Sequence, residues 1–246
     1  MKLLFLTSTR IGDAILSTGL LEHLRQEHPQ LDVTVACGPA AAPLFAALPG
    51  LKRIIMLDKM VFSLHWLRLW LLTIGTFWDL VIDLRNAPAT FLLGRRQRRG
   101  MPRSGGDILR IERIAKVLDL PGIVPPKLWT SPREDKLAKQ FLPDGGPILA
   151  IGPTANWQAK TWRAENFTEL VERLTAPTGI LPDARVVLLG RDDERPMAIR
   201  LIESIPVDRR IDLVGRLNLL TAYACLARTT FYIGNDSGLM HLAAAS

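Results

Sequence analysis

The sequence predicts an α/β protein built from two doubly wound parallel sheets, and two observations support this prediction. Short apolar runs of the kind buried in parallel strands alternate with stretches of helical spacing. The alternation is interrupted once, by a stretch rich in proline, glycine and charge between Pro121 and Pro147. We therefore expect an N-terminal domain over residues 1–124, a linker over 125–147 and a C-terminal domain over 148–246.

The individual elements follow from the hydrophobic period and from the turn residues between them. In the first domain we expect strands at 2–7, 31–36, 53–57 and 79–84 and helices at 14–27, 40–48 and 108–118. In the second we expect strands at 148–152, 185–190, 211–214 and 230–233 and helices at 164–174, 192–204 and 219–227. One short helix is expected within the linker, at 133–141. The chain stops at Ser246 inside a last expected helix, so we expect the second domain to be incomplete.

Composition places the chain among ordinary globular proteins, with 48% hydrophobic and 22% charged residues. Cys37 and Cys225 stand far apart in apolar surroundings, which favours a reducing, cytoplasmic setting. A strand-like run follows Met1 and Lys2 without a small-residue cleavage site, so we expect no secretory signal.

The most hydrophobic stretch spans residues 60–78. His65 and Arg68 interrupt it, which argues against a transmembrane span. Two interpretations remain open: a crossover helix packed on the sheet, or a helix whose outer face, with Trp66 and Trp70, lies on a membrane. Both hold if one face packs inward and the other does not.

The net charge of +7 is concentrated in one segment. Residues 85–116 carry nine lysines and arginines against two acidic residues, a local charge of +7, so the rest of the chain is close to neutral. The densest run is Arg95-Arg-Gln-Arg-Arg-Gly100. A local basic patch indicates an anionic partner such as a phosphorylated lipid surface, and a solvated surface turn is the structural alternative. Nucleic acid is disfavoured, because no RNA-binding signature or recognition helix accompanies the charge.

Several common chemistries leave no trace in the sequence. The patterns G-x-G-x-x-G, G-x-x-x-x-G-K-[ST], H-E-x-x-H and G-x-S-x-G are absent, and the four histidines are scattered. A dinucleotide-dependent dehydrogenase, a P-loop enzyme, a metallohydrolase and a serine hydrolase are therefore disfavoured.

One glycine-rich turn near the C-terminus indicates a ligand site. An apolar strand leads into Gly234-Asn-Asp-Ser-Gly238, and a good helix former follows. In α/β folds this arrangement presents backbone N–H groups and a helix N-terminus to a phosphate or a sugar diol. The alternative is that Asp236 or Ser237 only caps the helix.

Two further short motifs accompany this turn in a fixed order. Arg10-Ile-Gly-Asp13 follows the first strand, and Lys160-Thr-Trp162 follows the first strand of the second domain. Together with residues 234–242 these motifs resemble glycosyltransferase family 9, the lipopolysaccharide heptosyltransferases, along essentially the whole chain.

The resemblance implies a GT-B architecture, in which two Rossmann-like domains face each other across a cleft. It implies an inverting, metal-independent transfer of heptose from ADP-heptose to the inner core of lipopolysaccharide, with no cofactor beyond the nucleotide-sugar substrate. The acceptor is expected on the N-terminal domain and the donor on the C-terminal domain.

By resemblance, Asp13 is the general base that takes the proton of the acceptor hydroxyl. A carboxylate is a weak base, but it suffices if the sugar leaves first through an oxocarbenium-like transition state. A single carboxylate without a covalent nucleophile implies inversion. The other interpretation of Asp13 is a helix N-cap.

The donor site is expected on the second domain. Lys160 is expected to reach the donor phosphates, with Thr154 and Asn156 as hydrogen-bond partners in the same turn, and the backbone at Ser237 and Gly238 completes the phosphate site. Asp236 is expected to bind sugar hydroxyls, His241 to lie one turn further along the same face, and Glu194 to bind the ribose.

Arg10 and the arginines of the basic segment, Arg95, Arg96, Arg98, Arg99 and Arg103, are expected to hold acceptor or lipid phosphates. This predicts a peripheral protein on the cytoplasmic face of the inner membrane. The alternative is a non-catalytic family member that binds lipid or nucleotide sugar without turnover.

Overall fold

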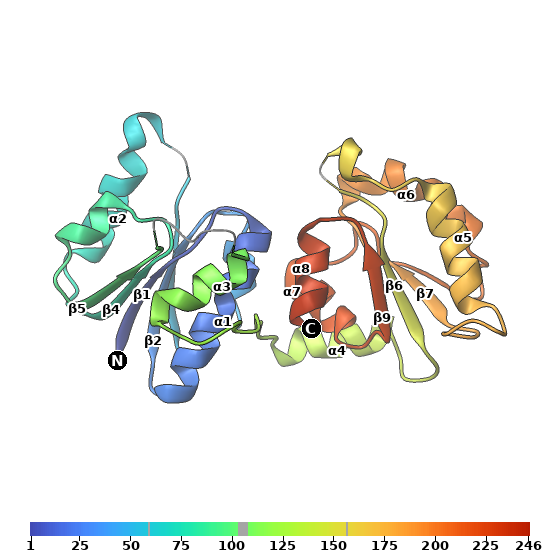
Figure 1. Cartoon of the computed structure of the whole chain (residues 1–246), viewed down its shortest axis with the longest axis horizontal. Helices are drawn as coiled ribbons and strands as arrows, with labels where there is room; N and C mark the ends of the chain where they lie inside the picture. The colour runs from blue at the N-terminus through green and yellow to red at the C-terminus, as the bar shows by residue number, and fades with distance from the viewer. Residues whose placement is uncertain (59, 103–107, 156) are drawn as a thin grey trace. The chain divides into compact units, whose positions relative to one another are not determined.

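The computed structural model describes residues 1–58, 60–102, 108–155 and 157–246. The chain divides into two compact units, Met1–Trp129 and Thr130–Ser246. Each unit is an α/β layer structure around one parallel sheet, and we describe each by itself (Figure 1).

The first unit contains a five-stranded parallel sheet with the order β3-β2-β1-β4-β5. Its strands are β1 (Lys2–Leu6), β2 (Asp32–Cys37), β3 (Leu51–Met56), β4 (Trp78–Asp83) and β5 (Arg95–Gly100). Its helices are α1 (Ile11–Glu27), α2 (Leu64–Thr73) and α3 (Arg110–Ala115), with 3-10 turns η1 (Ala42–Phe45), η2 (Val61–Ser63), η3 (Pro88–Leu92) and η4 (Lys116–Leu118).

Helices cover both faces of this sheet. Leu4 and Leu6 of β1 share one buried cluster with Leu69 of α2. Because side chains alternate along a strand, Leu3 and Phe5 point to the opposite face, where α1 lies with α3 beside it (Figure 1). Burial on both faces explains why β1 is a continuous apolar run.

The second unit contains a four-stranded parallel sheet with the order β8-β7-β6-β9. Its strands are β6 (Ile148–Gly152), β7 (Arg185–Leu188), β8 (Arg210–Asp212) and β9 (Phe231–Gly234). Its helices are α4 (Pro132–Phe141), α5 (Ala164–Thr175), α6 (Arg195–Ser204), α7 (Leu219–Leu226) and α8 (Gly238–Ala245), with 3-10 turns η5 (Gln158–Lys160) and η6 (Asp192–Glu194). Helices α5 and α6 bury Phe167, Val171 and Leu201 against one face of the sheet.

Strand register brings the predicted ligand-binding loops together within each unit. Leu6 of β1 pairs with Asp83 of β4, so the loops that follow these two strands are neighbours. Gly152 of β6 pairs with Gly234 of β9, so the turns carrying Lys160 and Asp236 are neighbours too. Both pairs of loops lie at the carboxyl ends of parallel strands, where ligands of open α/β sheets bind.

The predicted linker over 125–147 is not a separate segment. Leu128 is buried in the first unit, where the neighbouring Lys127 N–H donates to Thr18 Oγ1 at 3.0 Å. Helix α4 packs on α7 in the second unit, and the Arg228 side chain donates to the Leu142 carbonyl at 2.8 Å. The prediction of a linker relied on the proline- and charge-rich composition and overlooked the apolar residues that pack on each unit. The boundary between the units lies between Trp129 and Thr130.

The apolar stretch 60–78 contains a helix that packs on the sheet with one face and exposes apolar side chains on the other, which combines the two predicted interpretations. His65, Leu69 and Thr73 of α2 are buried, while Leu67 and Leu71 on the other side of the helix are exposed. Trp66 and Trp70 pack against the core and do not form the outer face, which corrects that part of the prediction. No helix in the described part of the chain is both long and apolar enough to span a bilayer.

Candidate active site

Asp13 lies in the first turn of α1, three residues after the N-cap residue Arg10. The N-cap interpretation of Asp13 is therefore wrong. Its Oδ2 accepts a long hydrogen bond of 3.4 Å from the Ser8 hydroxyl, and its Oδ1 lies 3.6 Å from Nε of Arg110. The side chain keeps 30% of its surface exposed, so one carboxylate oxygen can meet a ligand.

A small pocket of about 70 Å³ surrounds this carboxylate. Its walls come from residues 7–9 after β1, from Leu84 and Arg85 after β4, and from Arg110 and Ile114 of α3. Hydroxyl groups, one carboxylate and two guanidinium groups line it. This donor and acceptor set suits a hydroxylated ligand that also carries a negative charge.

Arg85 is a pocket residue that sequence reasoning missed. Its guanidinium stacks over Trp66 at 4.6 Å, and its buried Nη1 has no hydrogen-bond partner among the described residues. Burial lowers the pKa of Arg85, and the charge of Asp83 opposes this effect. The position directly after a buried strand was the signal that could have identified it.

The basic run 95–100 forms the edge strand β5, so the surface-turn alternative is wrong. Positive charge on an edge strand also prevents pairing with other chains. Arg98 is mostly buried, and its guanidinium donates to Asp83 Oδ2 at 2.8 Å and to Thr90 Oγ1 at 2.9 Å. Asp83 is fully buried and also accepts from the backbone N–H groups of Arg85 and Ala87.

These contacts correct the predicted phosphate patch. Arg98 is a structural residue, and Arg95 donates to the carbonyls of Phe91 and Leu93 at 2.9 and 2.8 Å. Arg99 pairs with Asp119 at 2.7 Å. Arg96 and Arg10 are exposed. Arg103 lies outside the described residues.

We expect Arg98→Met to lower the free energy of unfolding by about 3–5 kcal/mol, because it leaves the buried Asp83 carboxylate without its counter-ion. Urea denaturation measures the effect. Arg96→Met, an equal change of charge at an exposed neighbour, should stay within about 0.5 kcal/mol of wild type. Equal stabilities for the two variants would contradict the structural role of Arg98.

In the second unit, Lys160 and Asp236 form an ion pair through Nζ and Oδ2, and both side chains are about half exposed. Hydrogen bonding and charge from Lys160 lower the pKa of Asp236, and His241 adds a smaller effect of the same sign. An exposed pair of this kind contributes little to stability, so a charged ligand can displace either partner at small cost.

Asn235 holds the two turns of this site together, although no separate sequence signal pointed to its role. Its buried side chain donates to the Pro153 carbonyl at 2.8 Å and accepts from the Trp162 backbone N–H at 3.0 Å. The Lys160 turn is thereby fixed to the turn that carries Asp236.

The remaining predicted donor residues fall into two groups. The Thr154 hydroxyl donates to Glu194 Oε2 at 2.8 Å, and the same oxygen accepts from the Arg191 backbone N–H at 3.0 Å. Ser237 is the N-cap residue of α8, Gly238 opens the helix, and His241 lies in the next turn. Asn156 lies outside the described residues.

Within the described residues, no three His, Cys, Asp or Glu side chains gather as the ligands of one metal ion would.

Comparison with known proteins places this geometry in a family. The sequence profile of glycosyltransferase family 9 (heptosyltransferase) matches residues 110–246, which include the whole Lys160–Asp236 site. The chain belongs to glycosyltransferase family 9. It is therefore a glycosyltransferase of the heptosyltransferase family, as the motifs predicted.

Named relatives agree with this assignment. The chain is 26% identical over 284 residues to lipooligosaccharide heptosyltransferase 2 of Haemophilus influenzae, covering 100% of this chain and 80% of the relative. It is 24% identical over 288 residues to lipopolysaccharide heptosyltransferase 2 of Escherichia coli, with the same two coverages.

Solved structures confirm the fold class. A family 9 glycosyltransferase from Veillonella parvula has a TM-score of 0.77 at 19% identity, covering 99% of this chain and 78% of that chain. Heptosyltransferase II from E. coli has a TM-score of 0.73 at 22% identity, with coverages of 100% and 82%. The predicted GT-B class with two Rossmann-like domains is thus confirmed.

Proposed function

We propose that this family 9 member transfers heptose from ADP-heptose to the inner core of lipopolysaccharide, with inversion at the anomeric carbon and without a metal ion. The ion pair between Lys160 and Asp236, beside the N-terminus of α8, carries the proposal. It lies within the residues that match the family profile, and it places a lysine next to a helix N-terminus, where anions bind. The solved E. coli heptosyltransferase II is described as an ADP-heptose enzyme.

In the proposed reaction the anomeric C–O bond to the diphosphate breaks and ADP leaves with the bonding electrons. Lys160 and the backbone N–H groups at Ser237 and Gly238 stabilise the charge that develops on the phosphate oxygens. Asp236, His241, Thr154 and Glu194 position the nucleotide sugar. No protonating acid is required, since a nucleoside diphosphate is already a good leaving group.

The acceptor hydroxyl then forms the new C–O bond, and its proton passes to Asp13. In the first unit Ser8 and Arg110 hold the Asp13 carboxylate, while Arg85 and Arg110 offer positive charge to an anionic group of the acceptor. The acceptor hydroxyl attacks the anomeric carbon on the face opposite the departing diphosphate, with no covalent intermediate, and this gives inversion.

Transfer is tested by incubating the chain with ADP-heptose and a heptose-free lipopolysaccharide acceptor, followed by mass spectrometry of the acceptor. The expected result is a gain of one heptosyl residue. No gain from a chain that still binds ADP would overturn the assigned sugar or acceptor and favour the non-catalytic alternative.

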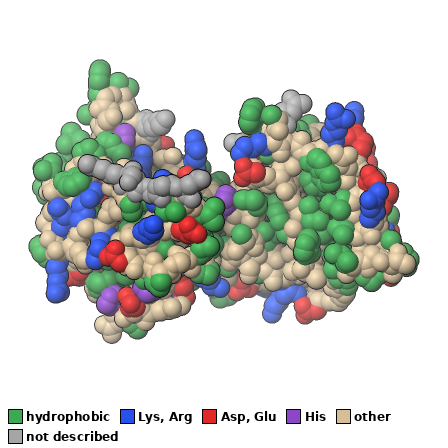
Figure 2. Space-filling view, in the orientation of Figure 1, with side chains coloured by type: hydrophobic (Ala, Val, Ile, Leu, Met, Phe, Trp, Pro, Cys, Tyr) green, Lys and Arg blue, Asp and Glu red, His purple; other side chains and the backbone are tan. Residues whose placement is uncertain are grey.

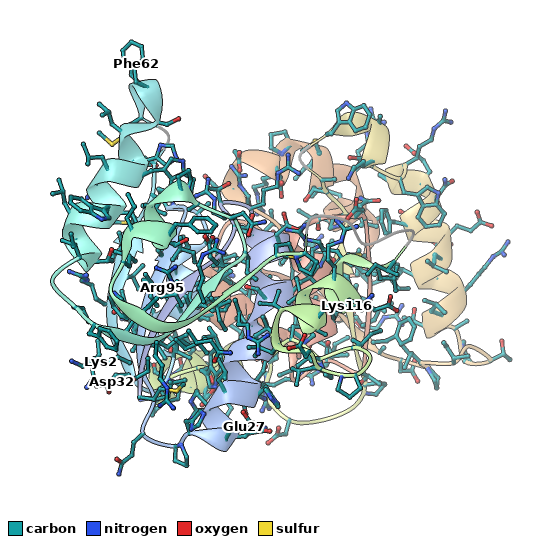
Figure 3. The ribbon with its side chains drawn as sticks, turned by 60° about the vertical axis from the view of Figure 1, so that its left-hand side comes forward. Lys2, Glu27, Asp32, Phe62, Arg95 and Lys116 are labelled. Carbon is teal, nitrogen blue, oxygen red and sulfur yellow. The ribbon has the colours of Figure 1, made fainter. Side chains whose placement is uncertain are left out.

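We also propose that the outer face of α2 and its preceding turn rests on the cytoplasmic surface of the inner membrane. Phe62 is 93% exposed and projects from the tip of this segment, where it and Ser63 both have positive φ (Figure 3). Leu67 and Leu71 of α2 are also exposed. Hydrophobic side chains gather on the face of the first unit that is drawn in Figure 2. An exposed apolar patch of this kind is typical of a membrane or protein contact. Exposed Arg68 and Arg96 would add attraction to anionic headgroups.

Phe62→Ser combined with Leu67→Ser should weaken sedimentation with anionic liposomes about tenfold, because two apolar side chains no longer enter the interface. The matched control is Ile180→Ser with Val207→Ser, two residues of the second unit that are 70% and 77% exposed. Equal sedimentation of both double variants would contradict the proposed membrane face.

A further inference from the structure

The Asn235 side chain bonds to both ends of the loop that carries Lys160. This loop leaves β6 at Pro153 and reaches Trp162 two residues before α5 begins. The Asn235 amide donates to the Pro153 carbonyl at 2.8 Å and accepts from the Trp162 backbone N–H at 3.0 Å. Asn235 is buried, so water competes little for these two bonds. One side chain therefore joins the first and the last residue of the loop.

The backbone of Asn235 is fixed to the sheet independently of its side chain. Asn235 directly follows β9, and its N–H donates to the Gly152 carbonyl at 3.1 Å, which continues the pairing of β9 with β6. The turn that carries Asp236 is therefore held at its start by backbone bonding. The Asn235 side chain remains available to hold the neighbouring loop.

Among the described residues, two polar contacts join the Lys160 end of the loop to the turn after β9. One is the hydrogen bond between Trp162 and Asn235, and the other is the ion pair between Lys160 and Asp236. The Trp162 ring meets the buried Phe167 ring edge-on at 5.0 Å, but this contact joins the loop to α5 and not to β9.

The ion pair alone is a poor means of holding the loop. Both of its side chains are about half exposed, and exposed pairs contribute little to stability. In the proposed reaction the pair also opens, because Lys160 turns to a phosphate group and Asp236 to a sugar hydroxyl. The Asn235 side chain bonds only to backbone groups of the loop, so its two bonds persist when the pair opens.

We propose that Asn235 is a positioning residue of the donor site, whose side chain keeps Lys160 beside the N-terminus of α8 while the ion pair opens to admit the diphosphate. A loop released from Asn235 would have to be ordered on binding, which weakens affinity. This inference rests on the proposed function, because it assigns a nucleoside diphosphate as the ligand of Lys160.

Asn235→Ala removes both side-chain bonds and leaves Lys160 unchanged. Isothermal titration with ADP should show a Kd raised about tenfold, because the lysine is no longer held at the phosphate site before the ligand arrives. In transfer assays the donor KM should rise as well.

The matched control removes a stabilising side-chain contact elsewhere in the same unit. The Ser131 side chain caps α4 and accepts from the Arg133 backbone N–H at 3.3 Å. Ser131→Ala should lower the Tm, because the helix loses its cap, and should leave the Kd for ADP within about twofold of wild type. An equal rise in Kd for Ser131→Ala and Asn235→Ala would overturn the inference, because loss of stability alone would then explain the effect.

Hydrogen exchange at the Trp162 amide tests the contact itself, and its first part uses chains that keep Asn235. In the wild-type chain without ADP this amide should exchange slowly, and in Lys160→Met, which lacks the ion pair, its rate should stay within about twofold. In Asn235→Ala it should exchange at least about tenfold faster, while the amides of β6 keep their wild-type rates. A Trp162 amide that loses its protection in Lys160→Met would overturn the inference, because the ion pair would then hold the loop.

A double variant tests whether Asn235 acts through Lys160. Asn235→Ala/Lys160→Met should bind ADP no more weakly than Lys160→Met alone. Additive losses, or an Asn235→Ala variant with wild-type affinity, would overturn this inference and leave the proposed function intact. A wild-type chain that binds no ADP would overturn both.

Discussion

Replacing Asp13 by asparagine should lower kcat for heptosyl transfer by about 10²–10⁴-fold, the usual contribution of a positioned general base. The amide keeps the shape of the side chain but cannot take the proton of the acceptor hydroxyl. Asp13 and the proposed donor residues belong to different units, so the Kd for ADP should stay within about twofold of wild type. Steady-state kinetics together with titration of ADP measures both quantities.

The matched control is Asp32→Asn, which removes an exposed carboxylate of the same unit that pairs with Lys52 at 3.2 Å. Its kcat should equal that of wild type. If Asp13→Asn retained wild-type kcat, Asp13 would not be the base, and the acceptor hydroxyl would have to lose its proton elsewhere.

Lys160→Met should lower kcat/KM by about 10²–10³-fold and raise the Kd for ADP, because it removes the side-chain cation proposed to meet the leaving diphosphate. Loss of Lys160 also leaves Asp236 unpaired, and its carboxylate would then repel the phosphates. Lys160→Arg should restore part of the activity, since it keeps the charge but changes the geometry.

Lys139→Met serves as the control for Lys160, because it removes an exposed lysine from α4 in the same unit. It should leave both the Kd and kcat/KM unchanged. Equal ADP affinity for Lys160→Met and Lys139→Met would place the diphosphate away from Lys160.

Much of this fold could be predicted because the core strands are buried on both faces. The continuous apolar runs within Lys2–Leu6 and Ile148–Gly152 are typical of strands that a parallel sheet buries on both faces, and few other structures fit them. Parallel strands end at one edge of each sheet, so the same pattern also located Asp13 and the turn 234–238 at strand ends. Their chemical roles remain proposals.

Charge and composition alone misled at other positions. The charge of Arg98 predicted a phosphate ligand, but its partner Asp83 lies 15 residues away and is joined to it only by the pairing of β4 with β5. The apolar sequence around Trp66 predicted an outer, membrane-facing position. In the structure Trp66 packs against the core, and the Arg85 guanidinium lies over its ring. The role of Asn235 depends on its contact with the loop after β6, roughly 80 residues earlier, which no local pattern reports.

The proposed chemistry is tested most directly by the configuration of the new glycosidic bond. The chain would be incubated with ADP-heptose of one anomeric configuration and a heptose-free core acceptor, and the purified product examined by NMR. The one-bond coupling between the anomeric carbon and its proton reports the configuration. Attack of the acceptor hydroxyl on the face opposite the departing diphosphate, assisted by Asp13 as base, predicts a product of opposite configuration to the donor. A product with retained configuration would contradict the account, because it requires either a covalent intermediate or attack from the same face as the departing diphosphate.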